Sequence, residues 1–398
     1  MAPPILRLHS CADEQDVRMD DLRARLMIST WLSVLATVLC SPLLSCGSRT
    51  IVIGAPLGLT GLTSAIGVQG RNGMEIAVDE INAGGGVRGR QLELAVYNDG
   101  DTADGGVQAD EALIARGAVA LVGHMSSQAA LKSVAYTTER KIVLISPTAS
   151  SNDFSGMDDY FFRVIGPNDQ QGRALAGEAL KRGFRRAAVA YNALNRSYTE
   201  AVYRGFKDSF EAGGGVVLAP GEITAQAGFN YDGLLQDLLS DKPELLLCAG
   251  SSFDLASLRQ AMFKKGTLLP TFASMWARTP DLLVFGGRAV EGVILAEGAA
   301  LSSTNPAEVA FRAEYKRRYG EEPTFASLYS YESIRLLELA LKKAKKLDGP
   351  SLKAALEALG QFQGLVDLIE LDRFGDTARP YSLTEVVDGV FKPLSQPR

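Results

Sequence analysis

Histidine and cysteine are rare in this chain, which has two His and four Cys among 398 residues. These numbers leave too few soft ligands for a structural zinc site and weaken any mechanism that needs a histidine base. The chain also lacks an excess of basic charge, since its formal net charge is -5. Nucleic-acid binding is therefore disfavoured, because it depends on clustered Lys and Arg.

Motifs for nucleotide binding and serine hydrolysis are missing as well. No segment has the Gly-Lys-Ser or Gly-Lys-Thr ending of a phosphate-binding loop, and no Gly-x-Ser-x-Gly elbow precedes a predicted helix. The glycines of residues 84–89 follow a predicted helix and precede a predicted strand, which reverses the order that dinucleotide binding requires. The sequence therefore predicts no cofactor and no catalytic constellation.

The first fifty residues have the order of a bacterial lipoprotein signal. Two arginines precede an uncharged stretch, residues 26–44, which runs into Ser45 and Cys46. We expect residues 1–45 to be removed as a signal peptide and the Cys46 thiol to be acylated. Met19 is an alternative start. The alternative interpretation is an uncleaved membrane anchor, since about nineteen apolar residues can span a bilayer.

Such cleavage would leave Cys248 as the only thiol besides Cys46, His124 as the only imidazole and Trp276 as the only indole. No intrachain disulfide could then form, because the Cys46 sulfur would carry lipid. His124 follows a predicted strand, and we interpret it as a structural imidazole and not as a catalytic base.

Short apolar runs alternate with amphipathic segments from residue 51 onward. Most runs are continuous hydrophobics, as in parallel strands that are covered on both faces, and the segments between them have helical periodicity. The sequence therefore predicts a doubly wound, Rossmann-like α/β fold. The predicted strands are residues 51–55, 92–98, 119–123, 142–146, 187–191, 216–219, 244–248 and 271–274.

Three further apolar runs break this alternation, because no helical pattern matches them. We interpret them as crossovers between two lobes, for which the chain is long enough. The predicted lobes are residues 50–165 plus 295–370 and residues 166–294 plus 371–398, the last of these containing a hairpin. The alternative is a single extended sheet. The three runs are residues 160–167, 291–298 and 365–371.

Small hydroxyl side chains follow two consecutive predicted strands. Ser126 and Ser127 come after the third strand, and Thr148 and Ser150 come after the fourth. Ligands of open α/β sheets bind beyond the carboxyl ends of strands, and a helix start there offers free N–H groups to an anion. Ser127, Thr148 and Ser150 are therefore candidates to donate hydrogen bonds to a carboxylate. These serines are equally well explained as caps or turn residues.

Four stretches stand in a characteristic order and spacing, namely residues 73–85, 123–127, 146–150 and 162–172. Through them the sequence resembles the type I periplasmic binding proteins, specifically the branched-chain amino-acid (leucine/isoleucine/valine) group that serves ABC importers. The similarity covers nearly all of the chain after the signal segment. The resemblance implies two lobes joined by three crossovers, with a ligand held between them by hinge closure.

Carried over position by position, the resemblance implies roles for the predicted hydroxyl site. Ser127 matches the serine that holds the ligand carboxylate, Ser150 matches a hydroxyl residue after the next strand, and Thr148 matches a backbone contact beside it. Other positions depart from the family. Ile66 replaces an aromatic residue, no tyrosine stands near Ser251, and Asn195-Arg196-Ser197-Tyr198 replaces a Tyr-Gly pattern.

Trp276 is the departure that bears most on the ligand. Amino-acid binders of the family usually carry an acidic residue near this position, where it pairs with the ligand ammonium. An unpaired ammonium in a closed cleft costs roughly several kcal/mol. We therefore expect either that Asp254 pairs with the ammonium or that Trp276 packs against an apolar or aromatic carboxylate without one. Trp276 as a core or hinge residue is the alternative.

These residues together predict a solute-binding lipoprotein and not an enzyme. It is expected to be extracytoplasmic, with the lipid as its only membrane contact, and to deliver its ligand to an ABC permease. The expected ligand is a branched-chain or hydrophobic amino acid, or a related apolar or aromatic acid. The alternative is a ligand-sensing or regulatory lipoprotein on the same fold that binds a partner protein. Neither a metal nor a nucleic-acid partner is predicted.

Overall fold

The computed structural model describes residues 50–224, 228–298 and 305–394. The predicted signal peptide and Cys46 lie outside these ranges. In the described ranges, every helix is too short or too polar to cross a bilayer.

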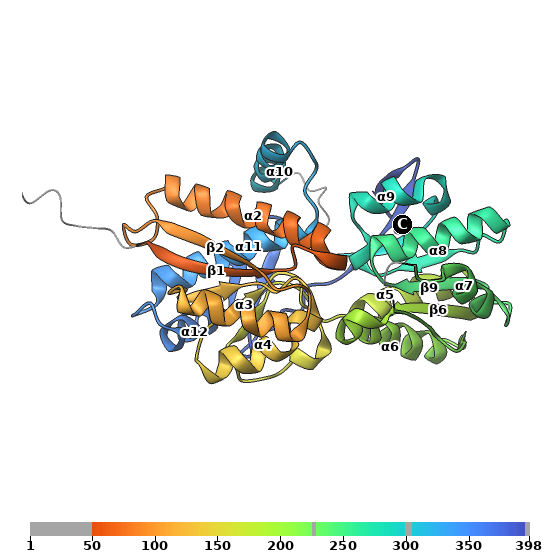
Figure 1. Cartoon of the computed structure of the whole chain (residues 1–398), viewed down its shortest axis with the longest axis horizontal. Helices are drawn as coiled ribbons and strands as arrows, with labels where there is room; N and C mark the ends of the chain where they lie inside the picture. Colours follow the sequence, from red (N-terminus) through yellow and green to blue (C-terminus); the bar gives the residue numbers. More distant parts are fainter. Residues whose placement is uncertain (1–49, 225–227, 299–304, 395–398) are drawn as a thin grey trace, which may run out of the picture. The chain divides into compact units, whose positions relative to one another are not determined.

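The first lobe is built on a parallel five-stranded sheet in the order β2-β1-β3-β4-β5. Helices α2 and α11 cover one face of this sheet, and α3 and α4 cover the other (Figure 1). The strands are β1 (Ile51–Leu57), β2 (Leu92–Asn98), β3 (Ala120–Val122), β4 (Leu144–Ser146) and β5 (Phe161–Arg163). The helices are α2 (Ser64–Ala83), α3 (Ala103–Ala115), α4 (Ser127–Glu139), α10 (Pro306–Tyr319), α11 (Phe325–Lys343) and α12 (Gly349–Glu357).

The second lobe has a larger sheet in the order β15-β14-β11-β10-β9-β6-β7, with β8 also paired to β6. Only β14 and β15 run antiparallel to their neighbours. The strands are β6 (Arg186–Asn192), β7 (Val216–Val217), β8 (Gly221–Ile223), β9 (Leu245–Ala249), β10 (Thr271–Ala273), β11 (Ile294–Glu297), β14 (Ser382–Val387) and β15 (Val390–Pro393). The helices are α5 (Asp169–Lys181), α6 (Arg196–Ala212), α7 (Tyr231–Leu239), α8 (Ser252–Lys265) and α9 (Pro280–Gly286).

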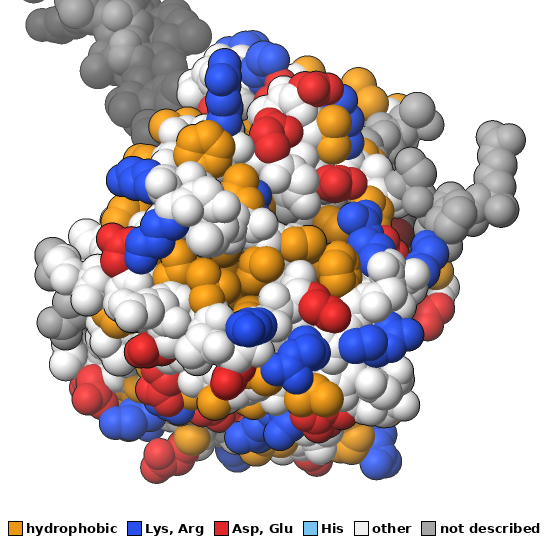
Figure 2. Space-filling model, turned by 90° about the vertical axis from the view of Figure 1, so that its right-hand side faces the viewer, with side chains coloured by type: hydrophobic (Ala, Val, Ile, Leu, Met, Phe, Trp, Pro, Cys, Tyr) orange, Lys and Arg blue, Asp and Glu red, His pale blue; other side chains and the backbone are white. Residues whose placement is uncertain are grey.

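Both sheets carry buried apolar side chains on their two faces, which is why the strands read as continuous hydrophobic runs. In the second lobe, α5 and α6 pack on one face, and α7, α8 and α9 pack on the other. Some apolar side chains of α8 and α9 remain exposed, among them Phe253, Val284 and Phe285. Figure 2 views this side of the molecule and shows hydrophobic side chains gathered on it.

The chain passes between the two lobes three times. It leaves the first lobe after β5, returns to it after β11 to form α10, α11 and α12, and leaves again between β13 (Leu368–Glu370) and β14. The fold is therefore α/β with two doubly wound lobes joined by three crossovers. β13 pairs only with β12 (Gln361–Gln363), in a separate two-stranded sheet. The predicted lobe limits are not tested by the structure as a whole. The predicted limit between residues 294 and 295 cuts through β11, which lies entirely in the second sheet.

Two buried arginines fasten the first crossover to the third. Arg163 forms an ion pair of 2.8 Å with Asp376. Arg379 donates to the carbonyl of Val164 (3.3 Å) and to the carboxylate of Glu332 (2.6 Å). These contacts join crossover residues to each other and to α11.

Candidate functional site

A small cavity, part of it open to solvent, lies between the two lobes. Each lobe supplies part of its wall, and none of the lining side chains carries a charge. The first lobe contributes Ile66, Met125, Ser127, Thr148 and Phe325, and the second contributes Asn195, Tyr198, Met275 and Trp276. The sequence prediction named four of these nine residues.

Strand order explains why these residues meet. In the first sheet the chain winds to one side from β1 to β2 and to the other side through β3, so β1 and β3 flank the switch point. Ligands of open α/β sheets bind at such a point, beyond the carboxyl ends of the strands. Ile66 lies in the first turn of α2, after β1, and Ser127 begins α4, after β3.

Ser127 is buried, and its hydroxyl holds two loops together. Its Oγ accepts hydrogen bonds from the backbone N–H groups of Ser150 and Ser151, both at 3.1 Å. A hydroxyl that accepts twice still has one proton to donate. The Ser127 hydroxyl is therefore a donor that lines the cavity beside the start of α4. Thr148, the other lining hydroxyl of this lobe, donates to the carbonyl of Met125 at 2.6 Å.

Ser126 and Ser150 are buried beside the cavity but do not line it. The Ser126 side chain caps α4 by accepting from the N–H of Ala129 at 3.1 Å. The Ser150 hydroxyl donates to the carbonyl of Thr148 at 3.1 Å. For these two residues the structure supports the alternative that the sequence left open, namely a cap and a turn residue.

Ser251 and Asp254 form a capping box at the start of α8 and are also absent from the cavity wall. The buried Asp254 carboxylate accepts from the N–H and hydroxyl of Ser251 (2.9 and 2.8 Å), from Asn192 Nδ2 (2.9 Å) and from the Tyr231 hydroxyl (2.7 Å). With four donors in place, this carboxylate stabilises the N-terminus of α8 through the capping box. The expected pairing of Asp254 with a ligand ammonium does not fit this position.

Trp276 lines the cavity within a 3₁₀ turn after β10, Met275–Ala277, and is 5% exposed. Its ring meets that of Tyr198 edge to face, with centroids 5.9 Å apart. The Tyr198 hydroxyl accepts from the backbone N–H of Trp276 at 3.3 Å and donates to Gln171 Oε1 at 3.0 Å. Burial raises the pKa of Tyr198 to about 12, so this hydroxyl stays protonated.

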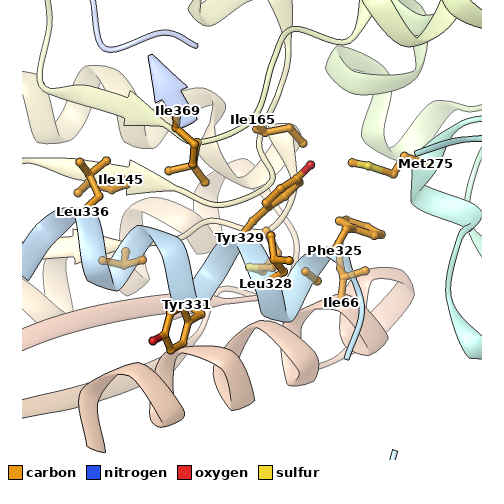
Figure 3. Packing of buried hydrophobic residues seen from close by; sticks show 14 of the residues in the cluster. Ile66, Ile145, Ile165, Met275, Phe325, Leu328, Tyr329, Tyr331, Leu336 and Ile369 are labelled. Carbon is orange, nitrogen blue, oxygen red and sulfur yellow. The ribbon is translucent and has the colours of Figure 1, made fainter. Parts of the chain in front are cut away.

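Gln171 also accepts from the N–H of Met275 at 3.0 Å. The turn that carries Trp276 is therefore held by α5 and α6 through uncharged groups. In Figure 3, Phe325 of α11 lies between Ile66 and Met275, so side chains of both lobes pack together at the cavity.

Asn195 was not among the predicted site residues, although it follows β6 as the hydroxyl residues follow β3 and β4. Its Oδ1 accepts from the N–H of Gln128 in the first turn of α4, at 3.2 Å, which makes a direct hydrogen bond between the lobes. In the second sheet, β6 and β9 flank the switch point. The strand-end rule applied to β6 would have identified Asn195. Tyr198, Met125, Met275 and Phe325 were missed as well.

His124 lies behind the cavity wall and is fully buried. Its Nδ1 is 2.8 Å from Asp99 and its Nε2 is 3.2 Å from Asp110. Burial alone would lower the pKa of His124, but the two carboxylates outweigh it and raise the pKa to about 10. These contacts agree with a structural imidazole. Nowhere in the described ranges do three or more His, Cys, Asp or Glu side chains gather in a way that could hold a metal ion.

Comparisons with known proteins agree with this architecture. The family described as "Periplasmic binding protein" matches residues 50–390. The Leu/Ile/Val-binding protein homolog 1 of Brucella suis is 23% identical over 355 residues, which are 87% of this chain and 94% of the relative.

Two solved structures show the same fold. A leucine-binding protein, LivK, from Thermotoga maritima has a TM-score of 0.80 at 23% identity, covering 87% of this chain and 98% of its own. A solute-binding protein from R. palustris in complex with benzoate has a TM-score of 0.77 at 22% identity, covering 87% and 95%. The match over residues 50–390 establishes the family: this chain belongs to the periplasmic binding proteins.

Proposed function

We propose that this protein is the solute-binding component of an ABC importer and captures a small carboxylate-bearing ligand by closure of its two lobes. The expected ligands are branched-chain or other hydrophobic amino acids and related apolar or aromatic acids. The observation that carries the proposal is the uncharged cavity whose wall is shared by Ser127 and Thr148 of one lobe and Asn195 and Trp276 of the other. We take the lobes to be residues 50–165 plus 295–370 and residues 166–294 plus 371–398, with β11 assigned as a whole to the second lobe, in whose sheet it pairs.

Closure couples to binding because the ligand contacts both walls at once only when the lobes are together. A ligand that binds the closed form more tightly shifts the population toward it. The bond between Asn195 and Gln128 is one contact that the two lobes make with each other in this form. The permease would then recognise the closed arrangement.

Relatives support this range of ligands. One similar structure is named a leucine-binding protein and another was solved with benzoate. Both names describe acids with an apolar body, which suits a wall of Ile66, Met125, Met275, Trp276 and Phe325.

We also propose an extracytoplasmic location with the protein held at the membrane by lipid on Cys46. The order of residues 26–46 and the membership in a periplasmic family support it. Fractionation of expressing cells tests this directly, because Cys46→Ala should move the protein from the membrane fraction to the soluble one. Retention of Cys46→Ala in the membrane would instead favour an uncleaved anchor.

Isothermal titration of the purified protein with leucine, valine, benzoate and 4-methylpentanoate tests the binding function. We expect at least one dissociation constant near the micromolar range, about 8 kcal/mol. Trp276→Ala should weaken the binding of that ligand by at least about 10-fold, as truncation of a central buried aromatic side chain does. Absence of binding to every carboxylate at millimolar concentration would overturn the proposal.

A further inference from the structure

We infer that the ligand of this cavity is a carboxylic acid without an ammonium group, such as an aliphatic or aromatic monocarboxylate. The inference rests on the proposed function, because it specifies which carboxylates the same cavity accepts. It follows from the hydrogen-bonding groups that the wall still has available: donors are in excess, and negatively charged acceptors are absent from the lining residues.

Three donors of the wall have no acceptor among the described residues. The Ser127 hydroxyl accepts two N–H groups and keeps its proton. The Asn195 amide is oriented by Gln128, since a backbone N–H can only donate and must therefore face Oδ1. The Nδ2 donors of Asn195 thus remain unpaired, as does the indole N–H of Trp276. Ser127 and Asn195 are 1% and 5% exposed, so both donors are largely withdrawn from water.

Carbonyl acceptors beside the cavity, in contrast, each already accept one hydrogen bond from a side-chain hydroxyl. The carbonyls of His124, Met125 and Thr148 accept from the hydroxyls of Ser146 (2.9 Å), Thr148 (2.6 Å) and Ser150 (3.1 Å). Side-chain hydroxyls thus cover the loop carbonyls to which an ammonium would donate.

Two acidic side chains that follow strand ends of the second lobe have partners as well. Asp254 accepts from four donors at the start of α8. Glu297, at the end of β11, is ion-paired with Arg278. Neither carboxylate lines the cavity, so neither is placed to receive a ligand cation.

The two ends of a ligand would therefore meet opposite conditions. A carboxylate would accept from Ser127 and Asn195 beside the N-terminus of α4, a helix of 13 residues whose dipole favours an anion. An ammonium would bring three N–H donors and a full positive charge to a wall that offers no negative charge, and the lining oxygens of Asn195 and Tyr198 already accept one hydrogen bond each. A ligand whose buried ammonium lacks a partner therefore loses more binding free energy than a ligand that has no ammonium.

Pairs of ligands that differ only in the ammonium test this inference. Isothermal titration would compare 4-methylpentanoate with leucine, and 3-phenylpropanoate with phenylalanine, with 4-methylpentanamide as the uncharged control. We expect at least one acid to bind at least about 30-fold more tightly than its amino acid, and the amide not to bind. An amino acid that binds as tightly as its acid would overturn the inference and leave the proposed function standing. Absence of binding by all four carboxylates would overturn both.

Asn195→Asp provides an independent test, because it keeps the oxygen that accepts from Gln128 and replaces the Nδ2 donors by a second, anionic oxygen. We expect the dissociation constant of the acid to rise at least about 10-fold in this variant. The ratio of the dissociation constants of the amino acid and the acid should fall. The matched control is Asn230→Asp, which keeps the cap of α7 at a position outside the cavity wall and should leave both affinities unchanged.

The variant also has a defined contrary outcome. The role assigned to Asn195 would be overturned if Asn195→Asp melts like the wild type and the ratio of its affinities for the acid and the amino acid is unchanged. If Asn195→Asp does not fold, the ligand pairs measured on the wild-type protein decide the question alone.

Discussion

The two walls of the cavity are built in different ways. In the first lobe, the loop that presents Ser127 is backed by a buried imidazole between Asp99 and Asp110. In the second lobe, the turn that presents Trp276 is backed by Gln171 and Tyr198, which are uncharged. The first wall offers a hydroxyl and a helix start to an anion, whereas the second offers a flat aromatic face and an amide.

This difference indicates how recognition is divided between the lobes. A polar anchor must be held at a fixed position, because hydrogen bonds lose strength quickly as distance and angle change. Buried opposite charges provide such fixation, at the risk of a large loss when one partner is removed. An apolar surface tolerates small displacements, so a wall held by neutral hydrogen bonds is sufficient for the lobe that we propose closes over the ligand.

Removing the buried cation should have the largest effect. His124→Gln leaves Asp99 and Asp110 without their shared charged partner, and we expect a loss of about 3–5 kcal/mol in the free energy of unfolding. Denaturation by urea, followed by circular dichroism, measures this loss. Lys132→Gln on α4 is the control, because its ion pair with Asp104 is exposed and its removal should change stability by less than about 1 kcal/mol. A His124→Gln protein as stable as this control would show that charge does not hold the first wall.

Two neighbouring serines allow a sharper test of the same wall. Ser127→Ala removes both the free donor and the acceptor of two loop N–H groups, so ligand affinity should fall by about 10- to 100-fold. Ser126→Ala removes the cap of α4 and a side-chain hydrogen bond to Asp101, which should cost about 1–2 kcal/mol of stability and leave affinity within about 3-fold of wild type. Calorimetric titration and thermal melting of both variants separate the two roles. Equal affinities in the two variants would contradict the assignment of Ser127 to the ligand.

The first wall was easier to predict from sequence than the second. Ser127 and Thr148 follow β3 and β4 directly, so a local rule about strand ends was enough to find them. Asn195 follows β6 in the same way, but its role depends on a hydrogen bond to Gln128, 67 residues earlier, which no local pattern contains. Phe325 and Met275 look like ordinary core residues in the sequence, and only the packing of the lobes brings them to the cavity.

The fold was predictable for a related reason. Strands covered on both faces leave continuous apolar runs, and most predicted strands agree with the structure within a few residues. The missed strands, β8 and β12, have three residues each and include exposed positions, so their hydrophobic pattern is too short to detect. Their pairing is set by the neighbouring strands β6 and β13.

The pH dependence of stability is specific to the first wall. The pKa of His124 is raised to about 10, above its value of 6.5 in an unfolded chain. The stabilisation is therefore complete below about pH 6.5 and is lost as the pH rises toward 10, with a slope of at most about 1.4 kcal/mol per pH unit. Burial also raises the pKa of Asp101 to about 6, but this group changes the slope of stability with pH mainly at and below the lower end of that window. Urea titrations between pH 6.5 and 9 should show this decline in the wild type and not in His124→Gln; parallel declines in both proteins would place the titrating group elsewhere.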